Sequence, residues 1–189
     1  MNIKQWLQAE YLPIPLIALM ALTRFHHFGD FLHLPDASLA VFFFAGFYRK
    51  KALLLFLMAL AAFIDYVAIA NGTSSFCVSP AYVFLIPTYA AMWLAGRYCA
   101  TFSAAKITAL AMQLAVAAVA ISTAFAISNG SFYWLSGRYS DLSWAQYSAR
   151  VAQYYPLYAG CALLYIVAGY AIMVLVKSLT TLAASHKEV

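Results

Sequence analysis

Long apolar runs, separated by short polar breaks, constrain this chain more than any other feature of its sequence. A helix that crosses a bilayer needs about 20 mostly apolar residues, or fewer where flanking side chains reach the interface or the bilayer thins. Segments of this kind lie at 11–25, 36–48, 52–70, 80–98, 104–128 and 154–176. The sequence therefore predicts an all-α polytopic membrane protein, with one six-helix transmembrane domain over residues 1–189.

The composition favours the same class of protein. Hydrophobic residues make up 66% of the chain and charged residues 9%, and so few charges cannot cover a water-exposed surface. A chain of 189 residues with six such helices leaves no room for a soluble nucleotide-binding module. If an ATPase is needed, it must be another chain.

The basic residues predict the orientation of the helices. They occur singly or in small groups, which argues against a nucleic-acid partner and is typical of topology signals in membrane proteins. The predicted helices place eight of them on one side and three, Arg24, Arg138 and Arg150, on the other. We therefore expect both termini in the cytoplasm. Glu10, with no small-residue cleavage motif nearby, predicts that the first helix is retained.

The three connections on the outer side carry most of the side chains that can support chemistry. They cover residues 24–35, 71–82 and 129–155, and they hold three of the four histidines, Cys77, Trp134 and Trp144. A site would therefore open outward. The third connection is predicted to be a loop with a short amphipathic helix. Its aromatic residues, Tyr133 and Trp134 among them, suit either an interfacial belt or a lid over a large, flat, amphiphilic ligand, and the two interpretations are compatible.

Cys77 lies between a Ser-rich turn and a predicted helix that starts at Pro80. A helix N-terminus stabilises a thiolate, so this thiol is a candidate reactive group, although a lone loop cysteine is usually inert. A disulfide between Cys77 and Cys161 is an alternative in an oxidising compartment. The chain has no Cys-x-x-Cys pair, which argues against a quinone-coupled thiol oxidoreductase.

Asp65 lies inside the third predicted helix, where an ionisable group is costly unless it faces a partner or a wet cavity. Arg24, Arg150 or a ligand amide are its expected partners, because all lie on the outer side. Tyr82, one turn into the next helix, is expected at a similar depth to Cys77 and Asp65.

Two adjacent histidines, His26 and His27, follow the first predicted helix. On a helix they would diverge by about 100°, so they cannot both face one ligand. Bis-histidine haem ligation needs histidines on facing helices, and the later predicted helices contain none.

The Arg24-Phe25-His26-His27-Phe28-Gly29 stretch, Asp65, and the Cys77 loop followed by Tyr82, together with the chain's size and six predicted helices, resemble the BtuM-type vitamin B12 transporters. These are small proteins of the bacterial inner membrane, related to the substrate-binding S-components of energy-coupling factor transporters. The resemblance implies an S-component-like bundle with an outward-facing pocket for cobalamin. It implies that Cys77 is the axial cobalt ligand, a role that suits a soft thiolate, and that Cys77 assists the decyanation of cyanocobalamin.

The resemblance also assigns residues around Cys77. It implies that His26, Asp65, Tyr82 and Arg150 line or support the site, and that the aromatic loop with Tyr133 and Trp134 covers the corrin ring. Cobalamin would be the substrate, and no other cofactor is expected.

The first helix departs from the wider S-component pattern. S-components dock onto their coupling subunit through an Ala-x-x-x-Ala face, where small residues let helices approach closely. Here Ala18 is followed four residues later by Leu22, so we expect no dedicated energy-coupling module.

Two alternatives stay open. One is an S-component for another vitamin, in which Cys77 only packs. The other is a membrane thiol or lipid-modifying enzyme, which is less favoured because the sequence offers no paired cysteine, no second intramembrane carboxylate and no Ser/His pair at usable spacing.

Overall fold

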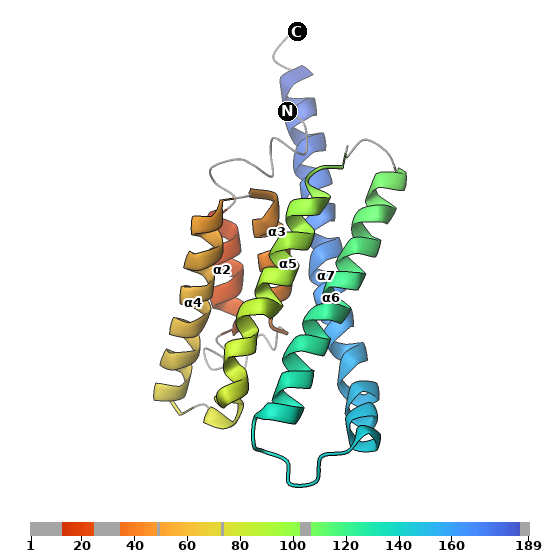
Figure 1. The fold of residues 1–189 in the computed structure, drawn as a ribbon. Coiled ribbons are helices and arrows are strands. Elements are labelled where there is room, and N and C mark those ends of the chain that lie inside the picture. Colours follow the sequence, from red (N-terminus) through yellow and green to blue (C-terminus); the bar gives the residue numbers. More distant parts are fainter. Residues whose placement is uncertain (1–12, 25–34, 49, 73, 103–106, 186–189) are drawn as a thin grey trace.

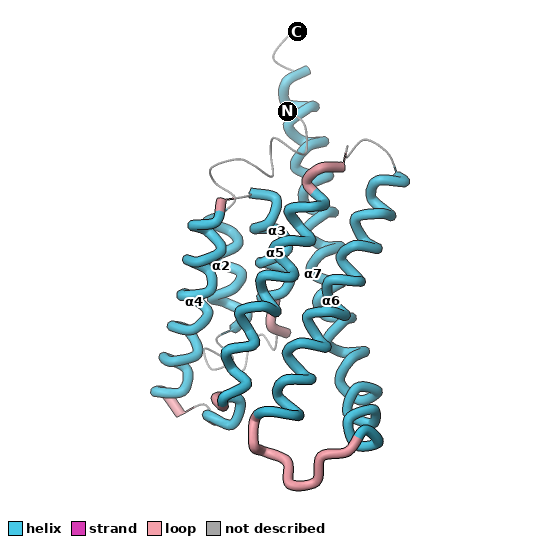
Figure 2. The backbone as a smooth tube through the Cα atoms, in the orientation of Figure 1, coloured by secondary structure: helices cyan, strands magenta, loops and turns pink. Residues whose placement is uncertain are grey.

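The computed structural model describes residues 13–24, 35–48, 50–72, 74–102 and 107–185, and within these ranges the chain is helical, with no strand. The helices are α2 (Pro13–Arg24), α3 (Ser38–Tyr48), α4 (Lys51–Ala70), η1 (Ser75–Cys77), η2 (Pro80–Phe84), α5 (Leu85–Cys99), α6 (Ile107–Leu135) and α7 (Trp144–Ser185). The α-helices lie side by side as a bundle (Figure 1, Figure 2). The all-α prediction is confirmed for the described residues.

The bundle has two ends, which we name after an arginine at each. The Arg97 end, at the top of Figure 1, is where α5 ends and α6 begins; the Arg24 end, toward the bottom, is where α2 and α4 end. Successive α-helices run in alternating directions between these ends (Figure 1).

Three of the described helices are long and apolar enough to cross a membrane, at Lys51–Ala70, Thr108–Leu135 and Trp144–Val176. The helices α2 and α3 are apolar but shorter. Large apolar side chains point outward from the long helices, as Phe63, Val119 and Leu164 do with 61%, 68% and 63% of their surface exposed. Such a surface is compatible with a lipid environment.

Helix α3 forms the centre of the bundle. Its residues 40–47 are all buried, which is the environment that a helix apolar on every side requires. The segment predicted at 36–48 begins as a helix at Ser38, whose backbone N–H donates to the Asp36 carboxylate at 2.9 Å.

Two glycines let α3 approach α5 closely. A Cβ placed on Gly96 would fall against the carbonyl oxygen of Phe43, and one on Gly46 would meet the backbone of Trp93 and Arg97. The backbones of α3 and α5 are therefore in direct contact near the Arg97 end.

The fourth predicted helix, 80–98, is divided at Leu85 into η2 and α5. Pro87 lies in the first turn of α5, where a backbone N–H has no intrahelical acceptor, so the missing donor of proline is tolerated there.

The largest correction concerns residues 129–155, which were predicted to be a loop with a short amphipathic helix. Instead, α6 continues to Leu135 and α7 begins at Trp144, so that only residues 136–143 connect them. The Tyr133 ring packs against Tyr139 and Tyr147, with centroids 5.1 and 5.4 Å apart. These aromatic contacts stabilise the end of α6 and the start of α7. Mean hydropathy along the sequence does not predict these helix ends, because the residues there are polar and aromatic.

Candidate functional site

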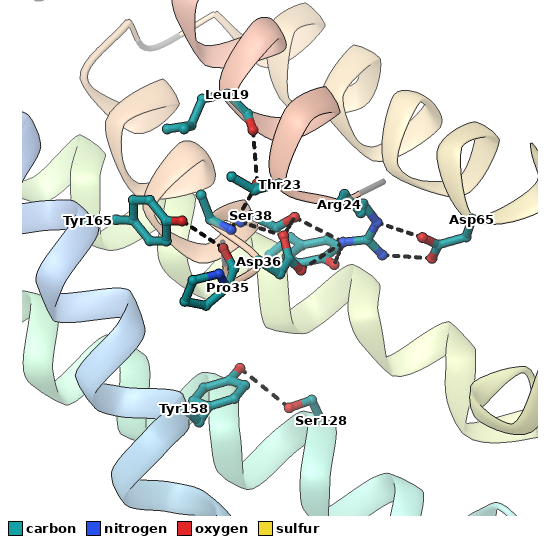
Figure 3. Close-up of polar contacts among 12 residues, drawn as sticks. Leu19, Thr23, Arg24, Pro35, Asp36, Ser38, Asp65, Ser128, Tyr158 and Tyr165 are labelled. Atoms are coloured by element: carbon teal, nitrogen blue, oxygen red, sulfur yellow. Dashed lines mark hydrogen bonds and ion pairs between the residues drawn. The ribbon is translucent and has the colours of Figure 1, made fainter. Parts of the chain in front are cut away.

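An ion pair between α2 and α4 organises the Arg24 end. Arg24 donates from Nε to Asp65 Oδ1 at 2.6 Å and from Nη2 to Asp65 Oδ2 at 2.7 Å, which is the bidentate geometry that favours arginine over lysine (Figure 3). Only 9% of the Arg24 side chain and 24% of the Asp65 side chain are exposed. Arg24 was one of the partners expected for Asp65, and this prediction is confirmed.

The remaining nitrogen of the guanidinium group links two further helices. Arg24 Nη1 donates to Tyr89 Oη of α5 at 2.7 Å and to Ser38 Oγ of α3 at 2.9 Å. It also lies 3.3 Å from Asp36 Oδ2. A single side chain therefore connects α2, α3, α4 and α5.

Tyr82 completes the shell around the carboxylate. Its hydroxyl donates to Asp65 Oδ2 at 2.6 Å, so η2 is held against α4. The prediction that Tyr82 and Asp65 lie at a similar depth is confirmed. Asp65 is thus stabilised by a guanidinium group and a phenol, as a charge inside an apolar helix requires.

A cavity of about 560 Å³ opens beside this network. Its walls include Arg24, Asp65, Tyr82 and Arg150, from α2, α4, η2 and α7. Three of the predicted site residues, Asp65, Tyr82 and Arg150, are therefore brought together. The volume is typical of small-molecule sites, and so is a mainly apolar wall with a few charged and polar groups.

The far wall of the cavity comes from α6 and α7, and apart from Arg150 it was not predicted. Its residues follow helical spacing on each helix: Phe125, Ser128, Asn129 and Phe132 on α6, and Tyr154, Leu157, Tyr158, Cys161 and Ala162 on α7. Steps of three and four residues place them on one face of each helix. This spacing is visible in the sequence and could have predicted the wall. It was missed because residues 129–155 were predicted to be mainly a loop, in which helical spacing has no meaning.

Two polar atoms of the cavity walls are buried without a hydrogen-bond partner in the described part of the chain: Arg150 Nε and Asn129 Oδ1. The Arg150 guanidinium group lies over the rings of Tyr139 and Tyr154, at 4.6 and 5.0 Å from their centroids. A buried donor and a buried acceptor without partners are costly, and both belong to side chains in the cavity wall, which makes Arg150 and Asn129 candidates to bind a ligand that carries amide or anionic groups.

The loop that carries Cys77 lies beside the cavity. Phe76 packs against Phe132 of the cavity wall, with centroids 5.7 Å apart, and Arg138 Nη2 donates to Val78 O at 3.5 Å. The backbone of Cys77 therefore lies in a segment fixed against that wall. The side chain of Cys77 and the whole of His26 lie outside the described residues.

Tyr133 and Trp134 take a different position from the other predicted site residues. Neither is among the described residues that line the cavity. Tyr133 is 1% exposed, and its hydroxyl donates to Ser143 O at 3.0 Å and accepts from Ser143 N at 2.8 Å. Both aromatic residues hold the end of α6 against the start of α7, with Trp134 packed on Trp144 at a centroid distance of 5.0 Å.

Cys161 is a free thiol in the cavity wall, so the alternative of a disulfide with Cys77 is wrong for this structure. Within the described ranges, no group of three or more His, Cys, Asp or Glu side chains is placed to hold a metal ion.

Comparisons with known proteins do not add a family to this geometry. No protein-family model matches the chain, and no curated protein matches it significantly.

Proposed function

We propose that this chain is a membrane transporter of the bacterial inner membrane that binds cobalamin in the cavity at the Arg24 end, with Cys77 as axial ligand to cobalt, and mediates its uptake. In cyanocobalamin the thiolate of Cys77 would displace cyanide from cobalt: a Co–S bond forms, the Co–CN bond breaks, and cyanide leaves with the thiol proton as HCN. In this proposal all six α-helices cross the membrane, the Arg24 end faces outward and both termini are cytoplasmic.

One observation carries the proposal. Asp65, Tyr82 and Arg150 come from three different elements, α4, η2 and α7, yet all line one cavity, and the loop of Cys77 packs against its wall. The sequence resemblance names these residues, and the cavity is where they meet.

The cavity chemistry is suited to a corrinoid. The macrocycle supplies the equatorial donors of cobalt, so the protein needs to add only an axial ligand, and a thiolate is a suitable one. Peripheral amides of the corrin would pair with Arg150 Nε and Asn129 Oδ1, which have no partner among the described residues. The rings of Phe125 and Phe132 offer apolar surface to the macrocycle. A corrinoid is larger than this cavity and would extend beyond its mouth.

The charges of the cavity are balanced. Its described walls contain Arg24, Arg150, Asp36 and Asp65, two positive and two negative groups. A ligand with many neutral amides fits such walls better than a strongly charged one, because no large excess charge must be compensated.

The visible absorption spectrum of the protein purified with cyanocobalamin tests the proposal. We expect a corrinoid that stays bound, with bands shifted from those of free cyanocobalamin, and we expect Cys77→Ala to abolish the shift. Cys161→Ala is the matched control: it removes a thiol from the same cavity but keeps the proposed ligand, so the shift should persist.

Two outcomes would contradict the proposal. If wild type retains no corrinoid, cobalamin is not the ligand, and an S-component for another vitamin becomes the better hypothesis. If Cys77→Ala binds corrinoid with an unchanged spectrum, cobalamin binding stands but thiolate ligation fails.

A further inference from the structure

A second cavity lies at the Arg97 end, away from the candidate site. It has a volume of about 520 Å³ and lies between α3, α5, α6 and α7. Its described walls contain no charged side chain, and apolar residues dominate them: Phe47, Leu110, Leu114, Val167, Ala171 and Val174. The one wall amide, Gln113, already donates to the carbonyl oxygen of Cys99 at 3.2 Å. The cavity is therefore suited to a hydrocarbon chain rather than a polar metabolite.

The length of the cavity matches one leaflet of a bilayer. Its wall on α7 extends from Val167 to Ser178, and eleven residues of α-helix rise about 16 Å. Half of a bilayer hydrocarbon core is about 15 Å thick. Val174 and Leu175 of this wall are 55% and 58% exposed, so the cavity is open at the side of the bundle, where lipid chains lie.

The end of the bundle at which this cavity lies carries positive charge. Its described basic side chains are Lys50, Lys51 and Arg97. Arg97 is exposed in the last turn of α5, two residues before the wall residue Cys99, and its guanidinium group lies 5.4 Å from the Trp93 ring. The described carboxylates lie elsewhere, at the Arg24 end or in the connection between α6 and α7: Asp36, Asp65 and Asp141.

We propose that this cavity holds an acyl chain of an anionic phospholipid, with the lipid phosphate near Arg97. The apolar walls accept the chain, the leaflet-long wall on α7 sets its depth, and the basic residues at this end of the bundle, Arg97 first, favour a negative headgroup. This inference requires that the chain spans a membrane. It is independent of the corrinoid proposal, because the two cavities share no described wall residue.

Native mass spectrometry of the full chain tests the proposal. The protein is reconstituted in vesicles of equimolar phosphatidylcholine and phosphatidylglycerol, extracted in mild detergent, and the co-purified lipid is identified. We expect wild type to retain phosphatidylglycerol in clear preference to phosphatidylcholine. Arg97→Gln should reduce that preference about fivefold, since one basic group near an anionic surface contributes about that factor.

Filling the cavity gives a second test. Ala171→Trp from α7 and, independently, Leu114→Trp from α6 should each reduce retained phosphatidylglycerol at least tenfold. Leu94→Trp is the matched control, because Leu94 is a 56% exposed apolar residue of α5 outside the cavity walls. It should retain lipid as wild type does.

The proposal fails if wild type retains the two lipids equally or retains neither. It also fails if a cavity-filling variant with native helix content, measured by circular dichroism, keeps its phosphatidylglycerol. The comparison of phosphatidylglycerol with phosphatidylcholine uses wild-type protein alone, so it tests the proposal even if a variant does not fold.

Discussion

The cavities at the two ends of the bundle have similar volumes, about 560 and 520 Å³, and α3, α5, α6 and α7 contribute to both. Their walls differ in kind. The cavity at the Arg24 end includes two arginines, two aspartates and two polar atoms without described partners. The described walls at the Arg97 end contain no charged group and one such atom, Tyr170 Oη. Volume alone therefore says little about what either cavity binds, and the charged groups of the walls say more.

The two ends are also held together by different interactions. At the Arg24 end, one guanidinium group bonds to side chains of three other segments and an ion pair bridges α2 and α4. At the Arg97 end, glycines bring the backbones of α3 and α5 into contact. The helices at the Arg24 end are therefore joined through side chains, whereas α3 and α5 near the Arg97 end touch through their backbones.

Removal of the guanidinium group should have the largest effect. Arg24→Ala leaves the Asp65 carboxylate mostly buried with one phenol as its remaining partner, which should cost about 3 kcal/mol of unfolding free energy. Denaturation in detergent micelles measures it. Arg138→Ala is the control. Arg138 makes one long hydrogen bond, of 3.5 Å, so its removal should lower the free energy of unfolding by less than about 1 kcal/mol. Equal losses in the two variants would contradict the role of Arg24 as the connector of this end.

At the opposite end, Gly96→Ala should cost about 3 kcal/mol, because its Cβ would meet the backbone of Phe43, which cannot move aside as a side chain would. Gly160→Ala is the control: a Cβ there meets nothing within 4 Å, and alanine should stabilise α7 by about 0.5–1 kcal/mol. Thermal unfolding of both variants would show opposite shifts. A Gly96→Ala protein as stable as wild type would mean that α3 and α5 are farther apart.

Arg150 is expected to affect binding more than folding. Arg150→Ala removes a donor without a described partner, so we expect about a tenfold loss of cyanocobalamin affinity, the effect of one hydrogen bond to a charged group. Arg97→Ala, which removes an arginine at the opposite end of the bundle and outside this cavity, should bind as wild type does. Titration followed by absorbance measures both, and wild-type affinity in Arg150→Ala would exclude it from the site.

The smallest effect concerns the aromatic cluster between α6 and α7. Tyr133→Phe removes the hydroxyl that bonds to Ser143, which should cost about 1 kcal/mol of stability and leave cyanocobalamin affinity unchanged. A loss of affinity at unchanged stability would instead support the sequence-based expectation that Tyr133 covers the ligand.

Much of this arrangement was predictable from local sequence. The third predicted helix, 52–70, differs from α4 by one residue at its start. Asp65 needed a partner because it lies inside an apolar helix, and Arg24 and Tyr82 were identified as residues at its depth. Both predictions follow from the high free-energy cost of an unpaired charge in an apolar environment. That cost applies to any ionisable residue inside an apolar helix, so it can be inferred from the sequence alone.

The extent of α6 and α7 was not predictable in the same way. Residues 129–135 and 144–153 are polar and aromatic, so hydropathy ends the helices too early. Their helical state depends on aromatic contacts between two segments, and such contacts are not visible in either segment alone. For the same reason, neither Asn129 nor the rest of the cavity wall on α6 and α7 was predicted to belong to the site, Arg150 excepted.

The sequence by itself determined that this chain forms apolar helices, and which charge inside them required a partner, because burial of apolar surface and of charge are properties of each segment. Only the tertiary structure decided that Arg24 also reaches Ser38, Asp36 and Tyr89, that residues of α6 and α7 complete the cavity, and that a second, apolar cavity exists at the Arg97 end. Those features depend on which helix faces meet, and that choice follows from the packing of all the helices at once.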